Sequence, residues 1–444
     1  MQTVTTDFER LVNHLTQTGR TQCPSSTSEP LAVVRDRALK QLNGAQFDPE
    51  EWNYTNVDSL VSGLLAGLEH CAAPSRGKDT AREEIRGLLA ARENAELPIT
   101  AVVGEEGVSS AATPVTRGGA KMYRMSAEEL KDQLSTTELL GSLSARSSNP
   151  LIGFNSSFFT DGIVIHAPRR TVCEEVIRVV HVVSGDRTVF PRTLIVAEEG
   201  SSVTVIEELL VIGDGVSRNP AVSEIVLSPG AHCSYTRVVD ASATAQYLSA
   251  LFVRADRDAR FRSCFMNTGG AVIRNEVYPS LVGPGAEVQV SGLALGNGKQ
   301  HVDTVVSMEH VAPHCESRQL FKGIYAGQSA GSFSGTIVVH EGAQKTNAFQ
   351  SSKSILLSPD ASVFTKPQLK IWADDVKCSH GATVGQIDED ALFYLRSRGI
   401  PSDAARVLLV HAFVGEVLAE INHTAVRAFI SGIVEDRLSQ LLVG

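Results

Sequence analysis

A turn motif that recurs about every 28 residues constrains the fold of this chain more than any other feature. Most copies have an apolar residue, one or two residues that often include Pro or an acid, and then Gly or Asp followed by a small residue. The copies are Gly200-Ser201, Gly230-Ala231, Asp258-Ala259, Gly285-Ala286, His314-Cys315, Gly342-Ala343 and Asp360-Ala361. The first six are 30, 28, 27, 29 and 28 residues apart, and the last follows after 18. A fixed period of this size predicts stacked β coils, because one coil cannot bury its inner face alone.

Three regions of the chain carry different patterns. Residues 1–145 and residues 386–444 contain apolar stripes at helical spacing. Residues 151–385 alternate short β-rich runs with turns and contain no convincing helix-length pattern. We therefore predict a mainly β protein, in which a parallel β-helix core is flanked by N-terminal and C-terminal helical regions. A β-sandwich with evenly spaced turns is the alternative that the periodicity leaves open.

The helix signals can be assigned to particular residues. In the N-terminal region they are two apolar stripes and a capping box: Phe8, Leu11, Val12 and Leu15; Val57, Leu60, Val61, Leu64, Leu65 and Leu68; and Ser126-Ala-Glu-Glu129. Between Leu97 and Met122 the pattern breaks, which indicates irregular structure or short strands. Near the C-terminus, Asp388 is expected to cap a helix that ends at Gly399, and Ser402 to cap the next one.

The overall composition excludes several classes of protein. Among 444 residues, 40 are Lys or Arg and 50 are Asp or Glu, and this net charge of −10 argues against binding nucleic acid by bulk charge. No apolar run approaches the roughly 20 residues that span a bilayer, so no membrane association is expected. Asp7 and Glu9 lie where a secretory signal would be basic and then apolar. The seven scattered cysteines form no C-x-x-C pair, which is typical of reduced thiols and favours a cytoplasmic location.

The densest polar stretch of the chain contains Cys378 and His380. On a strand these residues share one face, so their sulfur and imidazole can approach the same metal ion. Two ligands do not fill a tetrahedral site, so the others would come from another coil or from a second polypeptide. A half-site of this kind indicates an interface. The alternative is that both residues are simply packed or hydrogen-bonded, as the other six cysteines are expected to be.

Other polar groups make weaker candidates. Adjacent Asp374 and Asp375 would point to opposite faces of a strand, so we expect one of them to bond backbone at a turn. Four histidines are scattered over successive predicted coils, and no spacing forces them together: His301, His310, His314 and His340. We find no convincing nucleophile elbow, P-loop or dinucleotide fingerprint.

Six blocks of sequence resemble the SufB/SufD family of iron–sulfur cluster assembly proteins. The most specific is the segment 374–385, Asp-Asp-Val-Lys-Cys-Ser-His-Gly-Ala-Thr-Val-Gly. The others are Asp390-Ala-Leu-Phe-Tyr-Leu-Arg-Ser-Arg-Gly-Ile400, His340-Glu-Gly-Ala-Gln-Lys-Thr-Asn-Ala-Phe-Gln350, Thr365-Lys-Pro-Gln-Leu369, Asn155-Ser-Ser-Phe-Phe-Thr-Asp-Gly162 and Glu51-Trp-Asn-Tyr-Thr55. SufB-like chains typically read Glu-His-Glu-Ala-Thr where this one reads Cys378-Ser-His-Gly-Ala382, and they carry more core cysteines. The resemblance therefore favours the SufD branch.

The resemblance implies a right-handed parallel β-helix that acts as a non-catalytic scaffold. It implies a complex with the paralogue SufB and the ATPase SufC, or a homodimer when SufB is absent. SufC would dock on the C-terminal region 386–444, for which the expected contact residues are Phe393, Tyr394, Arg396, Arg398 and Gly399. A transient iron or iron–sulfur cluster would form at the SufB interface with His380 as a ligand and Cys378 in a less certain role. No tightly bound cofactor is expected in the isolated chain.

A carbohydrate-active lyase or hydrolase is the alternative function for a β-helix of this kind. Polysaccharide lyases and hydrolases also use β-helices, and they need paired carboxylates, or a Ca²⁺ site with a basic residue, in an exposed groove. The acidic and basic residues of this chain show no such cluster.

Overall fold

The computed structural model describes the chain from residue 29 to residue 443. It leaves out residues 43–44, 58–59, 65–82, 84, 88, 91, 93, 105–106, 111–115, 117, 126–137, 160–161, 185–187, 213–215, 217 and 242–243. The apolar stripe at Phe8–Leu15 and the capping box at Ser126–Glu129 therefore lie outside the described residues. Of the second stripe, Val57, Leu60, Val61 and Leu64 are helical.

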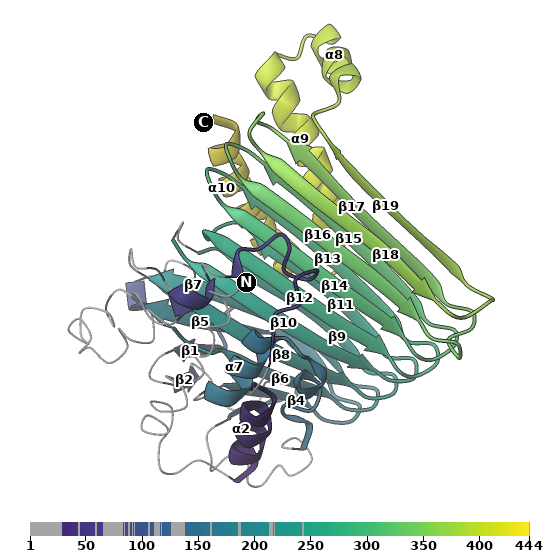
Figure 1. Cartoon of the computed structure of the whole chain (residues 1–444). Helices are drawn as coiled ribbons and strands as arrows, with labels where there is room; N and C mark the ends of the chain where they lie inside the picture. The colour runs from purple at the N-terminus through teal and green to yellow at the C-terminus, as the bar shows by residue number, and fades with distance from the viewer. Residues whose placement is uncertain are drawn as a thin grey trace.

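The core is a stack of coils in which each coil adds one strand to each of two parallel sheets (Figure 1). The first sheet has the order β19-β17-β15-β13-β11-β9-β7-β5-β1-β2, and the second has the order β18-β16-β14-β12-β10-β8-β6-β4-β3. The strands of the first sheet are β1 (Ala101–Gly104), β2 (Gly107–Ser110), β5 (Val172–Ser184), β7 (Ser202–Ile212), β9 (His232–Val239), β11 (Arg260–Asn267), β13 (Glu287–Gly296), β15 (Glu316–Tyr325), β17 (Asn347–Leu356) and β19 (Lys377–Gly385). Those of the second are β3 (Lys121–Arg124), β4 (Ile163–Ala167), β6 (Arg192–Ala197), β8 (Arg218–Leu227), β10 (Gln246–Ala255), β12 (Val272–Leu281), β14 (His301–His310), β16 (Ala330–Val339) and β18 (Ser362–Ile371). The predicted parallel β-helix is confirmed.

One corner of every coil is a turn with a residue in the left-handed region. The φ angles are +66° at Gly200, +65° at Gly230, +57° at Asp258, +74° at Gly285 and +59° at His314. Each of these turns donates a backbone N–H to a carbonyl in the next coil, for example Gly230 N to Arg257 O at 2.8 Å. The small residue after each turn is buried, so the coils stack closely there. The recurring motif thus marks the positions where the chain turns from the second sheet into the first.

Two copies of the motif were placed wrongly. In the sixth copy the left-handed residue is Lys345, with a φ of +61°, rather than Gly342. Asp360 lies in the turn between β17 and β18, which belongs to the opposite corner of the coil. The final interval of 18 residues is short because it crosses only one strand of the coil.

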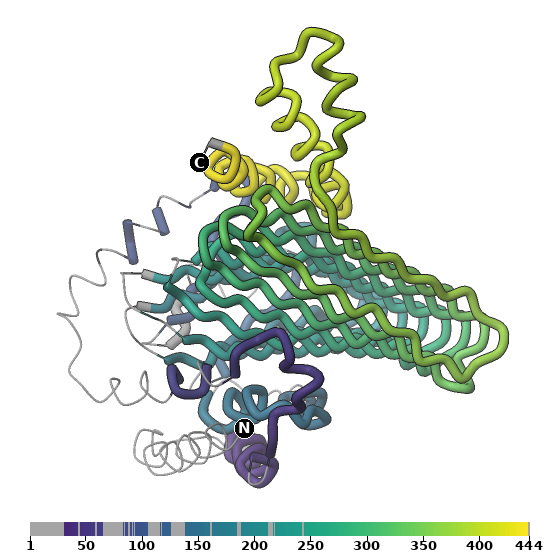
Figure 2. Tube along the Cα trace, turned by 45° about the horizontal axis from the view of Figure 1, so that its top comes forward, coloured from purple at the N-terminus to yellow at the C-terminus, as the bar shows by residue number. Residues whose placement is uncertain are grey.

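Helices cover the outer faces of the two sheets (Figure 2). On the second sheet lie α2 (Glu29–Leu42), which packs against α7 (Pro150–Phe158), and the short 3₁₀ helix η1 (Ser144–Arg146). A helix at 150–158 was not expected, since the β region was predicted to begin at 151. Asn149 caps it through its side chain, which accepts from Leu151 N at 3.0 Å, and Pro150 occupies its first turn.

The C-terminal helices are α8 (Glu389–Ser397), α9 (Ser402–Leu418) and α10 (Thr424–Val443). The helices α9 and α10 bury Val410, Val417 and Ile430 against the outer face of the first sheet, whereas α8 projects away from it (Figure 1). Asp388 caps α8 as expected, and Gly399 has the φ of +86° that suits a helix end. The second expected cap was wrong, because Ser402 is the first residue of α9 and Pro401 precedes it with no side-chain cap.

We expect the left-handed turns to tolerate glycine and to resist β-branched residues. A Cβ at Gly230 would meet no atom closer than 4.0 Å, so the cost of Gly230→Val comes from its φ alone and should be about 1–2 kcal/mol. The urea midpoint of the full chain measures it. Asp258→Gly, at the equivalent turn, is the matched control and should change the midpoint little. Equal midpoints for Gly230→Val and the wild type would show that the turn does not require a left-handed residue.

Candidate metal half-site at the terminal coil

The last coil of the β-helix, formed by β18 and β19, is open on one side. Within the described residues, β18 pairs only with β16 and β19 only with β17. Large apolar side chains lie exposed on or beside this coil, among them Phe364, Trp372 and Val384. Exposed edge strands of this kind are unpaired templates for another chain, and natural proteins usually cover or disrupt them.

Cys378 and His380 lie on the inward face of β19. Cys378 is in register with Ala348, and His380 is in register with Gln350. Ala348 and Gln350 are buried inside the β-helix, and side chains in register on neighbouring strands point to the same face. The two-residue spacing therefore places both candidate ligands at the mouth of the β-helix interior.

The two candidate ligands have different environments. Cys378 is half-buried and packs against the interior apolar core. Burial raises the pKa of its thiol, although a hydrogen bond from the backbone of Ala348 acts in the opposite direction. His380 is exposed to solvent. A thiol and an imidazole are the donors that iron and zinc accept, so these side chains fit a metal of that kind. The thiol must lose its proton when it binds a metal, and the raised pKa makes that loss less favourable.

No other ligand completes the site within the described part of the chain. There, no group of three or more His, Cys, Asp or Glu residues is arranged to hold a metal ion. Asp375 forms an ion pair with Lys345, and its N–H donates to Gln344 Oε1 at 3.0 Å. Its carboxylate therefore pairs with a lysine side chain at this turn, and the expected bond from an aspartate side chain to backbone is not seen at Asp375 among the described residues.

The scattered histidines do not converge with this half-site. His310 is buried, its Nε2 lies 2.8 Å from Ser317 Oγ, and burial lowers its pKa to about 4. His340 Nε2 lies 2.9 Å from Glu309 Oε1. His301 Nε2 lies 3.4 Å from Thr55 Oγ1, and His314 occupies a left-handed turn. These contacts agree with the interpretation that they are ordinary core and surface histidines.

The expected docking residues lie on a projecting hairpin made by α8 and α9. Phe393 is 71% exposed, and Tyr394 lies beside it with the Arg398 guanidinium 5.2 Å from its ring centroid. Arg396 lies in the last turn of α8 and Gly399 follows that helix. Phe393 and the neighbouring Tyr394, which is 56% exposed, together place aromatic surface on this projecting helix, and contiguous exposed apolar surface can mark a contact with another molecule.

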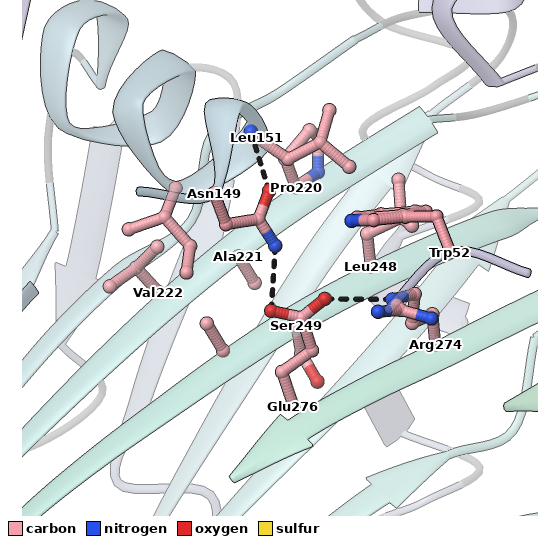
Figure 3. A pocket seen from close by; sticks show the side chains of 12 residues that line it. Trp52, Asn149, Leu151, Pro220, Ala221, Val222, Leu248, Ser249, Arg274 and Glu276 are labelled. Atoms are coloured by element: carbon pink, nitrogen blue, oxygen red, sulfur yellow. Dashed lines mark hydrogen bonds and ion pairs between the residues drawn. The ribbon is translucent and has the colours of Figure 1, made fainter. Parts of the chain in front are cut away.

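A buried polar network that joins the segment around Trp52 to the second sheet was not predicted from the sequence (Figure 3). The Arg274 guanidinium lies 3.8 Å from the Trp52 ring centroid and donates to Glu276 Oε1 at 2.7 Å. Asn149 Nδ2 donates to the other oxygen of Glu276 at 2.7 Å. The cavity beside these groups is only about 10 Å³, so we interpret the network as an anchor for the segment around Trp52. In the sequence, the block 51–55 that resembles the SufB/SufD family is the feature that pointed to this segment.

No helix among the described residues is long and apolar enough to cross a membrane. The family model described as "SUF system FeS cluster assembly, SufBD core domain" matches residues 180–413. This range covers most of the β-helix together with α8 and much of α9.

Curated relatives agree with the family model. An iron–sulfur cluster assembly SufBD family protein of Synechocystis is 28% identical over 414 residues, which is 89% of either chain. SufD of Escherichia coli is 33% identical over 240 residues, which cover 54% of this chain and 57% of that one. The protein ABCI7, chloroplastic, of Arabidopsis thaliana is 33% identical over 243 residues, 53% of this chain and 50% of the relative. Since the family model spans more than half of the chain, the protein belongs to the SufBD family of the SUF iron–sulfur cluster assembly system.

Proposed function

We propose that this protein is a non-catalytic scaffold subunit of a SUF complex, in which its terminal coil supports iron acquisition and de novo cluster formation. The observation that carries the proposal is the open coil that presents Cys378 and His380 on one face of an edge strand. An incomplete ligand pair at an unpaired edge suits a site that two polypeptides complete together. Iron, or the nascent cluster, is cargo that passes through this site.

The partner at the open coil is a SufB paralogue. Its own β-helix would continue the two sheets by pairing with β18 and β19, and it would cover the exposed side chains of Phe364 and Val384. SufB would also supply the missing ligands. When SufB is absent, a second copy of this chain takes the same place and forms a homodimer.

The partner at the C-terminal region 386–444 is the ATPase SufC. The exposed Phe393 and Tyr394 on the α8–α9 hairpin support a docking surface that lies apart from the terminal coil. SufC hydrolyses ATP, and its dimerisation strains the pair of β-helices until their interface admits iron or sulfide. The α9 helix packs on β13 and β15, so it offers a mechanical connection between the docking surface and the coils.

The rest of the proposal follows from this role. The chain itself holds no tightly bound cofactor and works in the cytoplasm without nucleic acid or membrane. Membership of the SufBD family argues against the alternative of a carbohydrate-active lyase or hydrolase. An activity screen on acidic polysaccharides tests that alternative.

Replacing His380 with alanine should lower cluster yield and leave the complex assembled. The imidazole is exposed, so its removal costs the fold little, while the half-site loses a ligand. Iron and sulfide per complex, measured after co-expression with SufB and SufC, report the yield, and gel filtration reports assembly.

His340→Ala is the matched control, because His340 is also partly exposed but its ring bonds Glu309 on another coil. Its cluster yield should equal that of the wild type. A His380→Ala complex with a full complement of iron and sulfide would show that His380 is no ligand. A chain that stays alone when all three proteins are co-expressed would contradict the scaffold role.

A charge placed at Phe393 should weaken docking of the ATPase. Phe393→Glu puts a carboxylate on the projecting helix, where burying it against a partner is unfavourable. Affinity for SufC, measured by calorimetry or by co-purification, should fall at least tenfold.

Val33→Glu provides the control for surface charge, since Val33 is 53% exposed on α2, which covers the other sheet. It should leave SufC binding unchanged. Retained binding by a folded Phe393→Glu variant would place the docking surface elsewhere.

A further inference from the structure

Gln350 lies directly beneath His380 in the interior of the β-helix. The two residues are register partners on β17 and β19, so their side chains leave neighbouring strands about 4.8 Å apart toward the same lumen. Gln319 is the next residue of this column, one coil deeper on β15. Two stacked glutamines therefore lie below the half-site, inside the open end of the β-helix.

The amide of Gln350 is buried and unpartnered. The side chain is 4% exposed, and neither its Oε1 nor its Nε2 has a hydrogen-bond partner among the described residues. Buried polar groups in proteins are almost always hydrogen-bonded, because an unmade bond costs free energy. An unpaired amide in the register position next to a candidate ligand is therefore available as a hydrogen-bond partner for that ligand.

Gly335, on the facing strand β16, makes the space that the amide occupies. A Cβ at this position would overlap the Gln350 amide nitrogen, so the amide fills the space that a side chain would otherwise take. Since no hydrogen bond holds the amide in this hollow, it can turn upward toward β19 without breaking one. In the terminal coil, the register partner of Gly335 is Pro367, whose side chain has no polar atom, and the register partner of Gln350 is His380.

We propose that Gln350 is a positioning residue for His380. Its amide oxygen accepts the N–H of one imidazole nitrogen, which leaves the lone pair of the other nitrogen directed out of the open coil. Metal-binding histidines almost always donate their second N–H to a carbonyl or carboxylate, and this bond fixes the tautomer and the ring orientation. The benefit to iron binding rests on the proposed function, whereas the hydrogen bond itself belongs to the isolated chain.

The imidazole tautomer of His380 tests the bond without any metal. Full-length chain labelled with ¹⁵N-histidine is recorded in long-range ¹H–¹⁵N spectra at a pH where the ring is neutral, and His380→Gln identifies the signal. We expect a single tautomer in the wild type and a mixture in Gln350→Leu. Gln350→Glu keeps an acceptor oxygen and should restore the single tautomer.

Gln319→Leu is the matched control, because Gln319 is also a buried and unpartnered luminal glutamine but lies one coil further from His380. It should leave the His380 signal as in the wild type. If Gln350→Leu does not fold, Gln350→Ser replaces it. The serine side chain is too short to reach the His380 ring, so this variant should also show a mixture of tautomers.

Ring shifts of His380 that stay unchanged when Gln350 is replaced would overturn the proposal. So would a tautomer mixture in the wild type. The proposed function fails separately, through full cluster yield in His380→Ala, and that result would leave the hydrogen bond to Gln350 intact.

Discussion

In-register stacking of the coils is the constraint on which the rest of this structure depends. Each coil buries its inner face only against the coils before and after it, so the stack needs a turn that repeats at the same place every time. Left-handed residues such as Gly230 and Lys345 supply that turn, and backbone hydrogen bonds join each one to the next coil. The last coil has a neighbouring coil on one side only, so one edge of β18 and one edge of β19 stay unpaired among the described residues. The candidate half-site therefore lies on a coil over which, within the described residues, no further coil is stacked.

Buried arginines attach the helical regions to the outside of this stack. Arg178 forms an ion pair with Glu208, donates to Leu97 O at 2.9 Å and lies 4.5 Å from the Phe429 ring centroid of α10. Arg192 holds α7 by donating to Asn155 Oδ1, and Arg274 holds the segment around Trp52 by lying over the Trp52 ring. Removing one partner of a buried pair leaves an uncompensated charge, so these contacts fix the position of each added segment.

Much of this architecture could be predicted from the sequence, because a period of about 28 residues is a local signal that repeats. The position of Cys378 and His380 on one face of β19 could also be predicted, since a spacing of two places both residues on the same face of a strand. The placement of Gln350 under His380 could not, because it depends on which residues of two strands lie in register. The helix α7 was missed because its cap at Asn149 lies in a stretch that reads as a linker.

The two ends of the β-helix are chemically different. At the first end, within the described residues, β2 runs antiparallel to β1 and β3 runs antiparallel to β4, so the parallel ladder stops there. At the other end, β18 and β19 leave the ladder free to continue. In the complex that we propose, two β-helices that meet through their terminal coils would each use up this open end. Such an assembly would hold two β-helices and would not grow into a fibre from that end.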